Sequence, residues 1–409
     1  MRPRSRMNQN PRNAAPPARP PAARPSLVRW LARAPRVRRL IPVSIRNWIR
    51  RRFLWEHMHE ELWAASDPYV GVEEISSYPA RVPVRLGILK EFTHAHRFYI
   101  GACRDMGVPY RLLDISGPDW FEVIADCGCD AFLVRPPAFL TIWKRMLFDE
   151  RLRVMVKDLG KTVYPSFDEM WLYESKRRMY YWCQAHDVPH PPTWIFYSRR
   201  EALDFCQTVP LPLVFKCDFG AGASGVMILR QRGALKRLVN RAFKKGIVRR
   251  NGDRRDRQWG SVILQQYVPE PAEWRITRIG KSFFGYQKGL KGDFHSGSYI
   301  RIWANPPKPL LDFARGITET GRFDSMAIDI LETADGRYLV TELQSLFGTS
   351  IDAQMRVDGQ AGRYVYDAAS DLYRFEPGLF SINGCCNLRV EALLERLGFS
   401  VPVVPGSDE

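Results

Sequence analysis

Long apolar segments are missing from this sequence. No uninterrupted run of about 18 apolar residues occurs, so no segment is predicted to cross a membrane. No apolar stretch follows the first arginines, and a secretory signal is therefore not expected. The eight Cys residues are scattered, and Cys127-Gly-Cys129 has neither the spacing of a zinc site nor a second pair. These absences indicate free thiols in a reducing cytoplasm. We expect the adjacent Cys385 and Cys386 to be buried rather than bridged.

Acidic residues and lysine are absent from residues 1–55, which contain fifteen Arg. Because the net charge of the whole chain is +17, the remaining residues carry only +2. The basic character therefore belongs to the N-terminal segment. A basic tail alone would bind nucleic acid nonspecifically and with strong salt dependence, so specific nucleic-acid binding is not expected.

The N-terminal segment changes character after residue 25. Residues 1–25 are rich in Pro, Arg, Ala and Asn and are predicted to be disordered, because they contain almost nothing to bury. Residues 26–82 start with Trp and Leu interleaved with Arg, which indicates short basic amphipathic helices. Such helices suit an anionic membrane surface or an acidic partner, contacted through residues 1–55, or they pack on the protein's own body. The first alternative would place a cytoplasmic protein peripherally at the inner membrane surface.

Short strands alternate with helices from about residue 83, and this alternation predicts a parallel sheet. We predict strands at Val84–Leu89, Tyr110–Ile115, Ala131–Val134 and Lys161–Tyr164, and helices at Arg97–Met106, Trp120–Cys127 and residues 140–160. No Gly-x-Gly-x-x-Gly follows the first strand, so a dinucleotide fold is not predicted. The loop after that strand holds His94, and loops at the carboxyl ends of parallel strands often contact ligand.

A lysine followed by a run of small residues is the most specific pattern in the chain. The apolar strand from Leu211 ends on Lys216, the six residues Gly220–Gly225 are all small, and a second strand begins at Val226. Glycines free the backbone to turn its N–H groups toward phosphate oxygens, and the lysine supplies a point charge for the same phosphates. The loop lacks Gly-Lys-Ser/Thr and leads into a strand, so it is not a P-loop. Six small residues exceed the need of a hairpin turn, which favours phosphate binding.

A predicted β-hairpin carries two acids. Asp335-Gly336 forms its turn, and Asp329 and Glu342 lie at similar distances from that turn on the two strands. Two carboxylates aimed at one point are costly unless a cation joins them, and hard oxygen ligands suit Mg²⁺. Each acid also has apolar neighbours, which fits two solvated strand positions equally well. The hairpin alone does not decide between these interpretations.

Two further elements place polar residues at the ends of predicted secondary structure. Lys176 stands at the start of a helix and would face a nucleotide if the preceding loop lines the site. The strand Ser261–Val268 runs into a polar segment that contains Glu273 and Arg275. Backbone groups where a strand passes into a polar segment can form hydrogen bonds with the edge of adenine. A carboxylate just beyond that point can accept hydrogen bonds from ribose hydroxyls.

In this order and at these intervals, the four elements resemble the ATP-grasp superfamily. The likeness is nearest to ribosomal-protein glutamate ligase and related carboxylate–amine ligases, and it covers roughly residues 83–350. It implies an α/β (α+β) fold with a parallel α/β domain, a small central lid, a catalytic antiparallel-sheet domain and a C-terminal extension. The corresponding ranges are 83–165, 166–268, 269–355 and 356–409.

The resemblance also implies a role for each matching residue. The contacts to ATP would be Lys176, Lys216, Gly220, Gly222, Ser224, Gly225, Gln266, Tyr267, Val268 and Glu273. Arg275 and Lys288 would act beside the reacting phosphate. The ligands of Mg²⁺, or of Mn²⁺, would be Asp329, Glu342 and Gln344. His295, Ser298 and Arg301 fall where the family has a substrate-facing loop and would contact the substrate, unless this segment is a structural Gly-rich loop. His94, in the loop after the first strand, is a further candidate substrate contact or an ordinary polar surface residue.

The sequence departs from the family pattern at the metal and hinge motifs. Gln344 replaces the usual Asn, and Gln265-Gln266 stands where an acid is common. Neither change removes a charge that the chemistry requires, so an active enzyme other than the glutamate ligase itself is expected. The implied reaction activates a small-molecule or peptide carboxylate as an acyl phosphate, which an amine attacks. Two alternatives remain: a kinase on the same fold that phosphorylates a hydroxyl, and a non-catalytic ATP-binding module recruited to a membrane or partner by its N-terminus.

Overall fold

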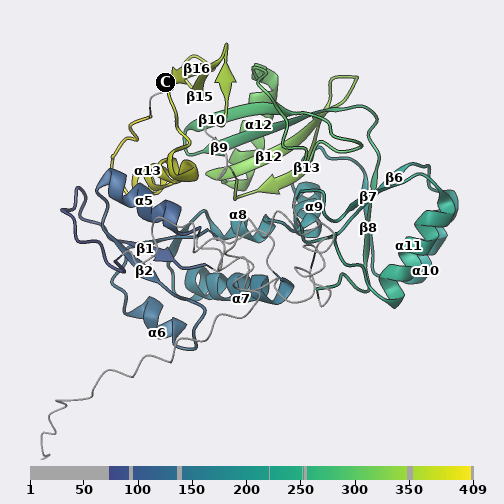
Figure 1. The fold of residues 1–409 in the computed structure, drawn as a ribbon, viewed down its shortest axis with the longest axis horizontal. Helices are drawn as coiled ribbons and strands as arrows, with labels where there is room; N and C mark the ends of the chain where they lie inside the picture. Colours follow the sequence, from purple (N-terminus) through teal and green to yellow (C-terminus); the bar gives the residue numbers. More distant parts are fainter. Residues whose placement is uncertain are drawn as a thin grey trace, which may run out of the picture. The chain divides into compact units, whose positions relative to one another are not determined.

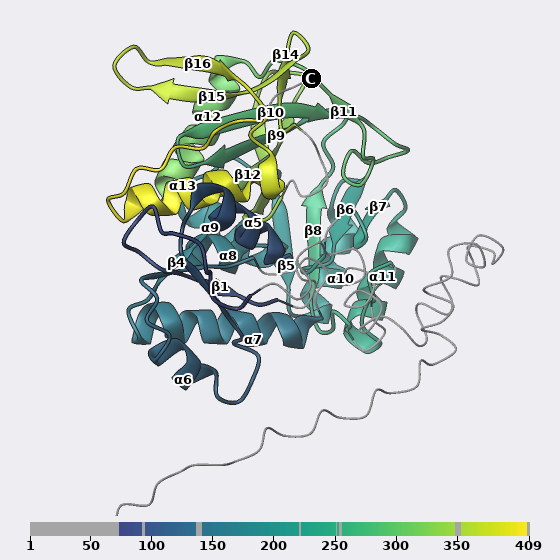
Figure 2. The same ribbon diagram turned by 60° about the vertical axis from the view of Figure 1, so that its left-hand side comes forward.

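The computed structural model describes residues 73–91, 95–135, 141–220, 222–250, 252, 256–347 and 353–406 (Figure 1, Figure 2). All of these residues belong to Arg50–Glu409, the second of two units of the chain; the first is Met1–Ile49. The predicted tail and nearly all of the predicted basic helices lie outside the described residues. In the described part, no helix is both long and apolar enough to cross a membrane.

Four short parallel strands form the first sheet, in the order β2-β1-β3-β4. They are β1 (Leu86–Leu89), β2 (Tyr110–Leu113), β3 (Ala131–Leu133) and β4 (Thr162–Tyr164). The connecting helices are α5 (Arg97–Met106), α6 (Trp120–Ala125) and α7 (Ile142–Arg153), which continues as a π-helical turn at Val154–Asp158. Gly107 ends α5 in the left-handed conformation, with φ of 65°. The predicted parallel sheet is therefore confirmed.

A second sheet of four antiparallel strands forms the lid, in the order β5-β8-β6-β7. Its strands are β5 (Thr193–Phe196), β6 (Leu213–Lys216), β7 (Val226–Leu229) and β8 (Val262–Gln266). Helices α10 (Arg199–Thr208) and α11 (Arg232–Lys244) pack on this sheet (Figure 1). Their buried apolar side chains and those of the strands form one core, so the lid is a compact layer of helices on a sheet.

The largest sheet is antiparallel and runs in the order β13-β12-β9-β10-β15-β14. Its strands are β9 (Ala272–Ile279), β10 (Ser282–Lys288), β12 (Ser325–Glu332), β13 (Tyr338–Gln344), β14 (Arg356–Val357) and β15 (Gln360–Asp367), with β11 (Arg301–Ile302) beside β10 and β16 (Leu372–Pro377) beside β15. The helices α8 (Phe167–Leu172), α9 (Lys176–Ala185) and α12 (Lys308–Gly321) share a core with it.

Alternation along the strands gives the large sheet two different faces. On β12, Ile328 and Ile330 point into the core that α9 and α12 share with the sheet. Asp329, between them, points to the opposite face. The lid was predicted to cover residues 166–268, but Met179 and Cys183 of α9 pack in the core of the large sheet. Apolar helix faces can pack on either neighbouring sheet, and tertiary structure decides which.

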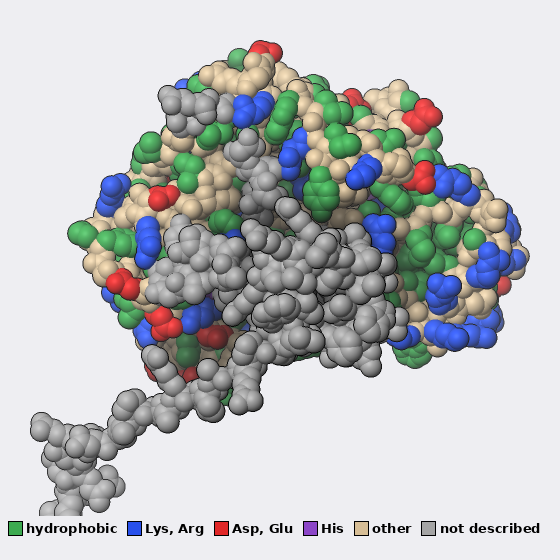
Figure 3. Space-filling model, in the orientation of Figure 1, with side chains coloured by type: hydrophobic (Ala, Val, Ile, Leu, Met, Phe, Trp, Pro, Cys, Tyr) green, Lys and Arg blue, Asp and Glu red, His purple; other side chains and the backbone are tan. Residues whose placement is uncertain are grey.

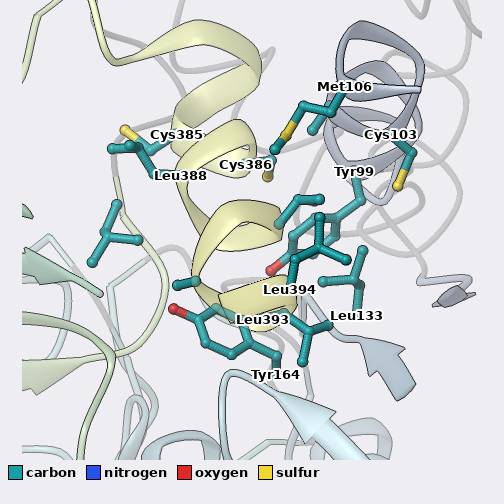
Figure 4. Packing of buried hydrophobic residues seen from close by; sticks show 14 of the residues in the cluster. Tyr99, Cys103, Met106, Leu133, Tyr164, Cys385, Cys386, Leu388, Leu393 and Leu394 are labelled. Carbon is teal, nitrogen blue, oxygen red and sulfur yellow. The ribbon is translucent and has the colours of Figure 1, made fainter. Parts of the chain in front are cut away.

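The C-terminal residues, predicted as an extension at 356–409, pack on the rest of the described chain. Strands β15 and β16 complete the large sheet. Helix α13 (Cys386–Arg396) packs against α5, and Figure 4 shows Cys386 and Leu394 directed toward Tyr99 and Met106. All eight Cys residues are free, and Cys385 and Cys386 are buried, as predicted.

Glu169 joins the parallel-sheet domain to the large sheet. It completes the capping box of α8, where its carboxylate accepts a hydrogen bond from the backbone N–H of Ser166 at 2.7 Å. The other carboxylate oxygen accepts from the backbone N–H of Ser325, at the start of β12, at 2.5 Å. The side chain is fully buried, and this burial raises the pKa of the Glu169 carboxyl to about 7.

We expect the protein to lose stability through Glu169 as the pH rises from 5 to 8. The folded-state pKa lies above the ordinary value of 4.5, so the stabilisation is complete below pH 4.5 and lost as the pH rises through 7. This shift corresponds to on the order of 3 kcal/mol. Urea unfolding across this pH range should show a flatter dependence for Glu169→Gln than for the wild type. The exposed control Glu122→Gln should retain the wild-type slope, and equal slopes for all three proteins would contradict the assignment.

Candidate nucleotide and acyl-transfer site

A hollow of about 460 Å³ lies between the lid and the large sheet. The lid contributes the end of β6 with its glycine loop and the end of β8 with the segment that follows. The large sheet contributes the β12–β13 hairpin and residues 290–296, after β10. The loops of the two sheets touch, since a Cβ added to Gly297 would lie 2.9 Å from the carbonyl oxygen of Gly222. The cleft therefore combines all four elements that the sequence singled out.

The glycine loop turns sharply at the end of β6. The backbone N–H of Cys217 donates to the carbonyl of Gly225 at 2.7 Å, which closes the loop. Gly222 adopts φ of 59°, and a Cβ on Gly225 would lie 2.6 Å from Cβ of Cys217, so neither position tolerates a larger residue without strain. Within the described part, the hydroxyl oxygen of Ser224 is buried and has no hydrogen-bond partner. An unsatisfied hydroxyl in this loop is a ready contact for a ligand oxygen.

Lys216 ends β6 and lines the cleft. Its side chain forms no hydrogen bond or ion pair with any described residue. Burial lowers the pKa of Lys216 to about 8, although the nearby Glu342 carboxylate acts in the opposite direction. A partly buried lysine held without a fixed anion is suited to receive one from a ligand.

Lys176 stands at the first residue of α9 and is paired. Its ammonium nitrogen lies 3.0 Å from Oε1 of Glu342 and donates to the carbonyl of Gly220. Burial would lower the pKa of Lys176, but the Glu342 carboxylate outweighs it and holds the pKa above its usual value. The same lysine therefore ties the β12–β13 hairpin to the glycine loop.

Charged side chains form a row across the face of the large sheet that carries Asp329. Glu342, Asp329 and Arg275 are direct cross-strand neighbours on β13, β12 and β9. Arg275 donates to both carboxylate oxygens of Asp329, at 2.7 and 2.9 Å. Lys288 also donates to Asp329, and its nitrogen lies 2.6 Å from Oε1 of Glu273. Asp329 is 1% exposed. Burial would raise its pKa, but Arg275 and Lys288 hold the pKa well below its usual range.

The three predicted metal ligands share this face and have the right chemistry for Mg²⁺, because all offer carboxylate or amide oxygens. Oε1 of Glu342 is buried, and the ammonium nitrogen of Lys176 lies 3.0 Å from it. Both oxygens of Asp329 already face cations, and the amide oxygen of Gln344 lies 3.4 Å from Nη2 of Arg275. Among the described residues no group of three His, Cys, Asp or Glu side chains gathers as a metal cluster. The donor set fits a metal ion that would share Asp329 with Arg275 and Lys288.

The predicted hinge residues Gln266, Tyr267 and Val268 line the cleft where β8 ends. Glu273, predicted to hold ribose, lines it too, but its Oε1 is engaged by Lys288 and by the hydroxyl of Ser296 at 3.3 Å. Glu270, which sequence reasoning did not select, is exposed at the same rim with φ of 42°. The structure therefore offers two carboxylates to a ribose, of which Glu270 has none of these internal contacts.

The predicted substrate contacts are not gathered at one point. His295 lines the cleft, and its Nδ1 lies 2.8 Å from the carbonyl oxygen of Lys288. Ser298 is buried and accepts a hydrogen bond from the backbone N–H of Ile300. Arg301 is the cross-strand neighbour of Lys288 in the β10–β11 pair, so it lies on the face of the large sheet that carries Asp329. His94 lies outside the described residues. These substrate roles stay predictions.

Asp218 belongs to the site, although sequence reasoning passed it over. Its Oδ1 accepts from the backbone N–H of Arg177 and from the hydroxyl of Ser175, both at 2.9 Å, and thus caps the N-terminus of α9. Its carbonyl accepts from the backbone N–H of Lys176 at 3.1 Å. Asp218 thereby connects Lys176 to the strand end that carries Lys216. The sequence signal for Asp218 was its place between Lys216 and the glycine loop, because an acid at such a position needs a hydrogen-bond or ion-pair partner.

Replacing Asp218 by Ala should misplace Lys176. ATP turnover should then fall by roughly 10- to 100-fold, because a small displacement of a group that acts on the substrate lowers the reaction rate by about this factor. Asp218→Asn keeps the acceptor oxygen and should lose much less. Hydrogen exchange of the first turn of α9 should rise in Asp218→Ala only. Asp204→Ala, at an exposed position on α10, serves as the matched control. Normal exchange together with full loss of turnover would show that Asp218 does not act through α9.

A parallel sheet, a four-stranded lid and a large antiparallel sheet around one cleft constitute the ATP-grasp fold, so the predicted fold class is confirmed. No protein-family model matches the chain, and no curated protein matches it. Solved structures do match, among them the RimK-domain ATP-grasp protein of Sphaerobacter thermophilus DSM 20745, at 18% identity over 63% of this chain and 90% of that one, with a TM-score of 0.46.

Two further matches are ligases or synthetases by name. N5-carboxyaminoimidazole ribonucleotide synthetase of Thermotoga maritima shares 13% identity, covering 79% of this chain and 78% of that one, with a TM-score of 0.49. D-alanine–D-alanine ligase of Bacillus anthracis shares 13% identity, covering 76% and 98%, with a TM-score of 0.48. At such low identities the similarity concerns the fold, and neither substrate nor site is transferred from it.

Proposed function

We propose that this protein is an ATP- and Mg²⁺-dependent ligase that activates a substrate carboxylate for attack by an amine. The observation that carries the proposal is Lys216, a partly buried cation that pairs with no described residue, next to a glycine loop whose buried Ser224 hydroxyl oxygen has no hydrogen-bond partner in the described part of the chain. Both groups line one cleft with Lys176 and Glu342. This arrangement supports the binding of a phosphate chain at the mouth of the loop.

The proposed reaction has two steps. A carboxylate oxygen attacks the γ-phosphorus of ATP, the bond to the bridging oxygen breaks, and ADP leaves. The amine then attacks the carbonyl carbon of the acyl phosphate, and inorganic phosphate and a proton are released. Lys216, Lys176 and the loop N–H groups would hold the phosphates, while Arg275 and Lys288 would face charge that develops beside Asp329. Mg²⁺ held by Asp329, Glu342 and Gln344 would neutralise phosphate charge.

The test uses the full chain with Mg-ATP and a panel of carboxylates (amino acids, peptides and sugar acids) combined with amines. We expect ADP, phosphate and an amide product in equal amounts, measured by chromatography and mass spectrometry. A carboxylate labelled with ¹⁸O should deliver one ¹⁸O atom to the released phosphate. A phosphorylated alcohol without free phosphate would establish the kinase alternative instead. ATP binding without turnover across the panel would favour the non-catalytic module.

A further inference from the structure

A second charged region lies on the lid, apart from the cleft. Residues 230–257 contain twelve Lys and Arg and two Asp, a net charge of +10. The residues after 55 have a net charge close to zero only because acidic residues elsewhere balance this strongly basic segment. Figure 3 shows Lys and Arg side chains gathered over the lobe that α10 and α11 form at the right of Figure 1. This charge is separate from the N-terminal arginines.

The exposed face of α11 carries the centre of this basic region. Leu235, Leu238, Val239 and Ala242 are buried in the lid core. Arg237, Arg241 and Lys244, at positions i, i+4 and i+7, are exposed and lie along one side of the helix. None of the three side chains forms a hydrogen bond or ion pair with a described residue. Some exposed cations elsewhere are paired, for example Lys281 with Glu395 at 2.8 Å.

The stability of the lid does not account for this row. Like charges at i and i+4 on a helix destabilise it by a few tenths of a kcal/mol. The lid core is complete without these side chains, since α11 already buries its apolar face. An unfavourable row of cations on an otherwise well-packed helix points to a partner of opposite charge.

An exposed tryptophan adjoins the basic row. Trp259 is 68% exposed. It lies next to the C-terminal end of α11, where a Cβ on Gly246 would be 3.4 Å from its Cβ. Tryptophan beside Lys and Arg is characteristic of protein surfaces that sit at the level of lipid headgroups. The row follows the outer side of a helix rather than a groove, a shape that suits a flat surface better than the wrapped backbone of a nucleic acid.

We propose that the basic face of α11, defined by Arg237, Arg241 and Lys244 with Trp259 at its edge, binds an anionic membrane surface through lipid phosphate groups. The apolar side of α11 is buried, so the contact is electrostatic and Trp259 is the apolar anchor. This interaction is independent of the proposed ligase activity. It would hold the lid, one wall of the cleft, against the membrane surface.

The experiment measures co-sedimentation of the full chain with vesicles of 30% phosphatidylglycerol in phosphatidylcholine. The test variant is Arg237→Glu/Arg241→Glu/Lys244→Glu. Each basic residue near an anionic surface contributes about 1 kcal/mol, so partitioning should weaken on the order of 100-fold. The control Arg153→Glu/Lys157→Glu/Arg374→Glu makes the same change in net charge at exposed positions outside the lid. It should weaken partitioning only a few fold, and vesicles of pure phosphatidylcholine should not bind.

A second measurement locates the contact within the chain, since the N-terminal arginines also favour anionic vesicles. Acetylation of Lys244 and Lys245, followed by mass spectrometry, should slow in the presence of anionic vesicles, while acetylation of Lys157 should not. Unprotected Lys244, or equal losses in the two triple variants, would overturn the proposal. So would a test variant that loses binding to a 30-base-pair DNA duplex but retains vesicle binding, because the partner would then be a nucleic acid. Unchanged circular dichroism confirms that each variant folds.

Discussion

Replacing Lys216 by Met is expected to lower ATP turnover by on the order of 100-fold or more. Lys176, Lys288 and Arg275 are already paired with carboxylates, whereas Lys216 has no partner among the described residues. Its charge is therefore available to phosphate oxygens without breaking an existing ion pair. Because Met has a similar length and no charge, the variant removes the interaction without opening a cavity. Calorimetry with ATP should show the loss directly as weaker binding.

The pH dependence of ATP binding tests the same residue without altering the fold. Burial lowers the pKa of Lys216 to about 8, so most sites without ATP carry the charge at pH 7 but only about one tenth do at pH 9. Affinity for ATP should therefore fall about tenfold between these pH values. Lys216→Arg, which stays charged, should remove this dependence while retaining binding.

A matched control for both experiments is Lys245→Met, an exposed lysine of the same lid outside the cleft. Its ATP affinity and pH profile should equal those of the wild type. If Lys216→Met bound ATP as tightly as this control, Lys216 would not be the phosphate ligand. The glycine loop would then lose its strongest support as a nucleotide site.

The second large effect is expected when both acids of the hairpin lose their charge. Asp329→Asn with Glu342→Gln should abolish metal-dependent ATP turnover, because an amide pair cannot offer a divalent cation the charge that two carboxylates offer. Mn²⁺ binding, followed by electron paramagnetic resonance, should disappear in the double variant. Asp335→Asn alters an exposed acid at the turn of the same hairpin and should leave both readouts unchanged.

Stability must be separated from metal binding in that experiment. Asp329 neutralises the buried cations Arg275 and Lys288, and removing one partner of a buried ion pair costs about 3–5 kcal/mol. The Glu342→Gln single variant leaves that cluster intact and should still weaken Mn²⁺ binding. Full turnover in a folded double variant would disprove the metal assignment.

Much of the fold was predictable from local pattern. Helix α5 was predicted at Arg97–Met106 and has these bounds, and β7 begins at Val226, as predicted. Gly107 follows the helix and Gly225 precedes the strand, so a glycine marks one boundary of each element in the sequence itself. The pairing of Asp329 with Glu342 was also predicted, but it depends on a β-bulge between Asp329 and Ile330 as well as on the turn at Asp335-Gly336. Short-range chemistry was sufficient for α5 and β7.

The partners of the charged residues were not predictable. Asp329 pairs with Arg275, which is 54 residues away in the sequence, and Asp218 caps a helix 41 residues before it. Such contacts depend on which strands become neighbours, and backbone pairing between distant strands leaves no trace in local periodicity. For the same reason residues 356–409 were predicted only as an extension, whereas β15 in this range pairs with β10 of the large sheet.

The charged residues at strand ends and the place of the glycine loop could be found in the sequence, because both depend on neighbours in the chain. The packing of distant elements sets which charges are neutralised. In the part of the chain that the structure describes, it brings no partner to the side chain of Lys216 or to the exposed cations of α11. A charged side chain is available to bind a ligand or a surface when no oppositely charged residue of the protein pairs with it. Whether such a pair forms depends on how distant elements pack.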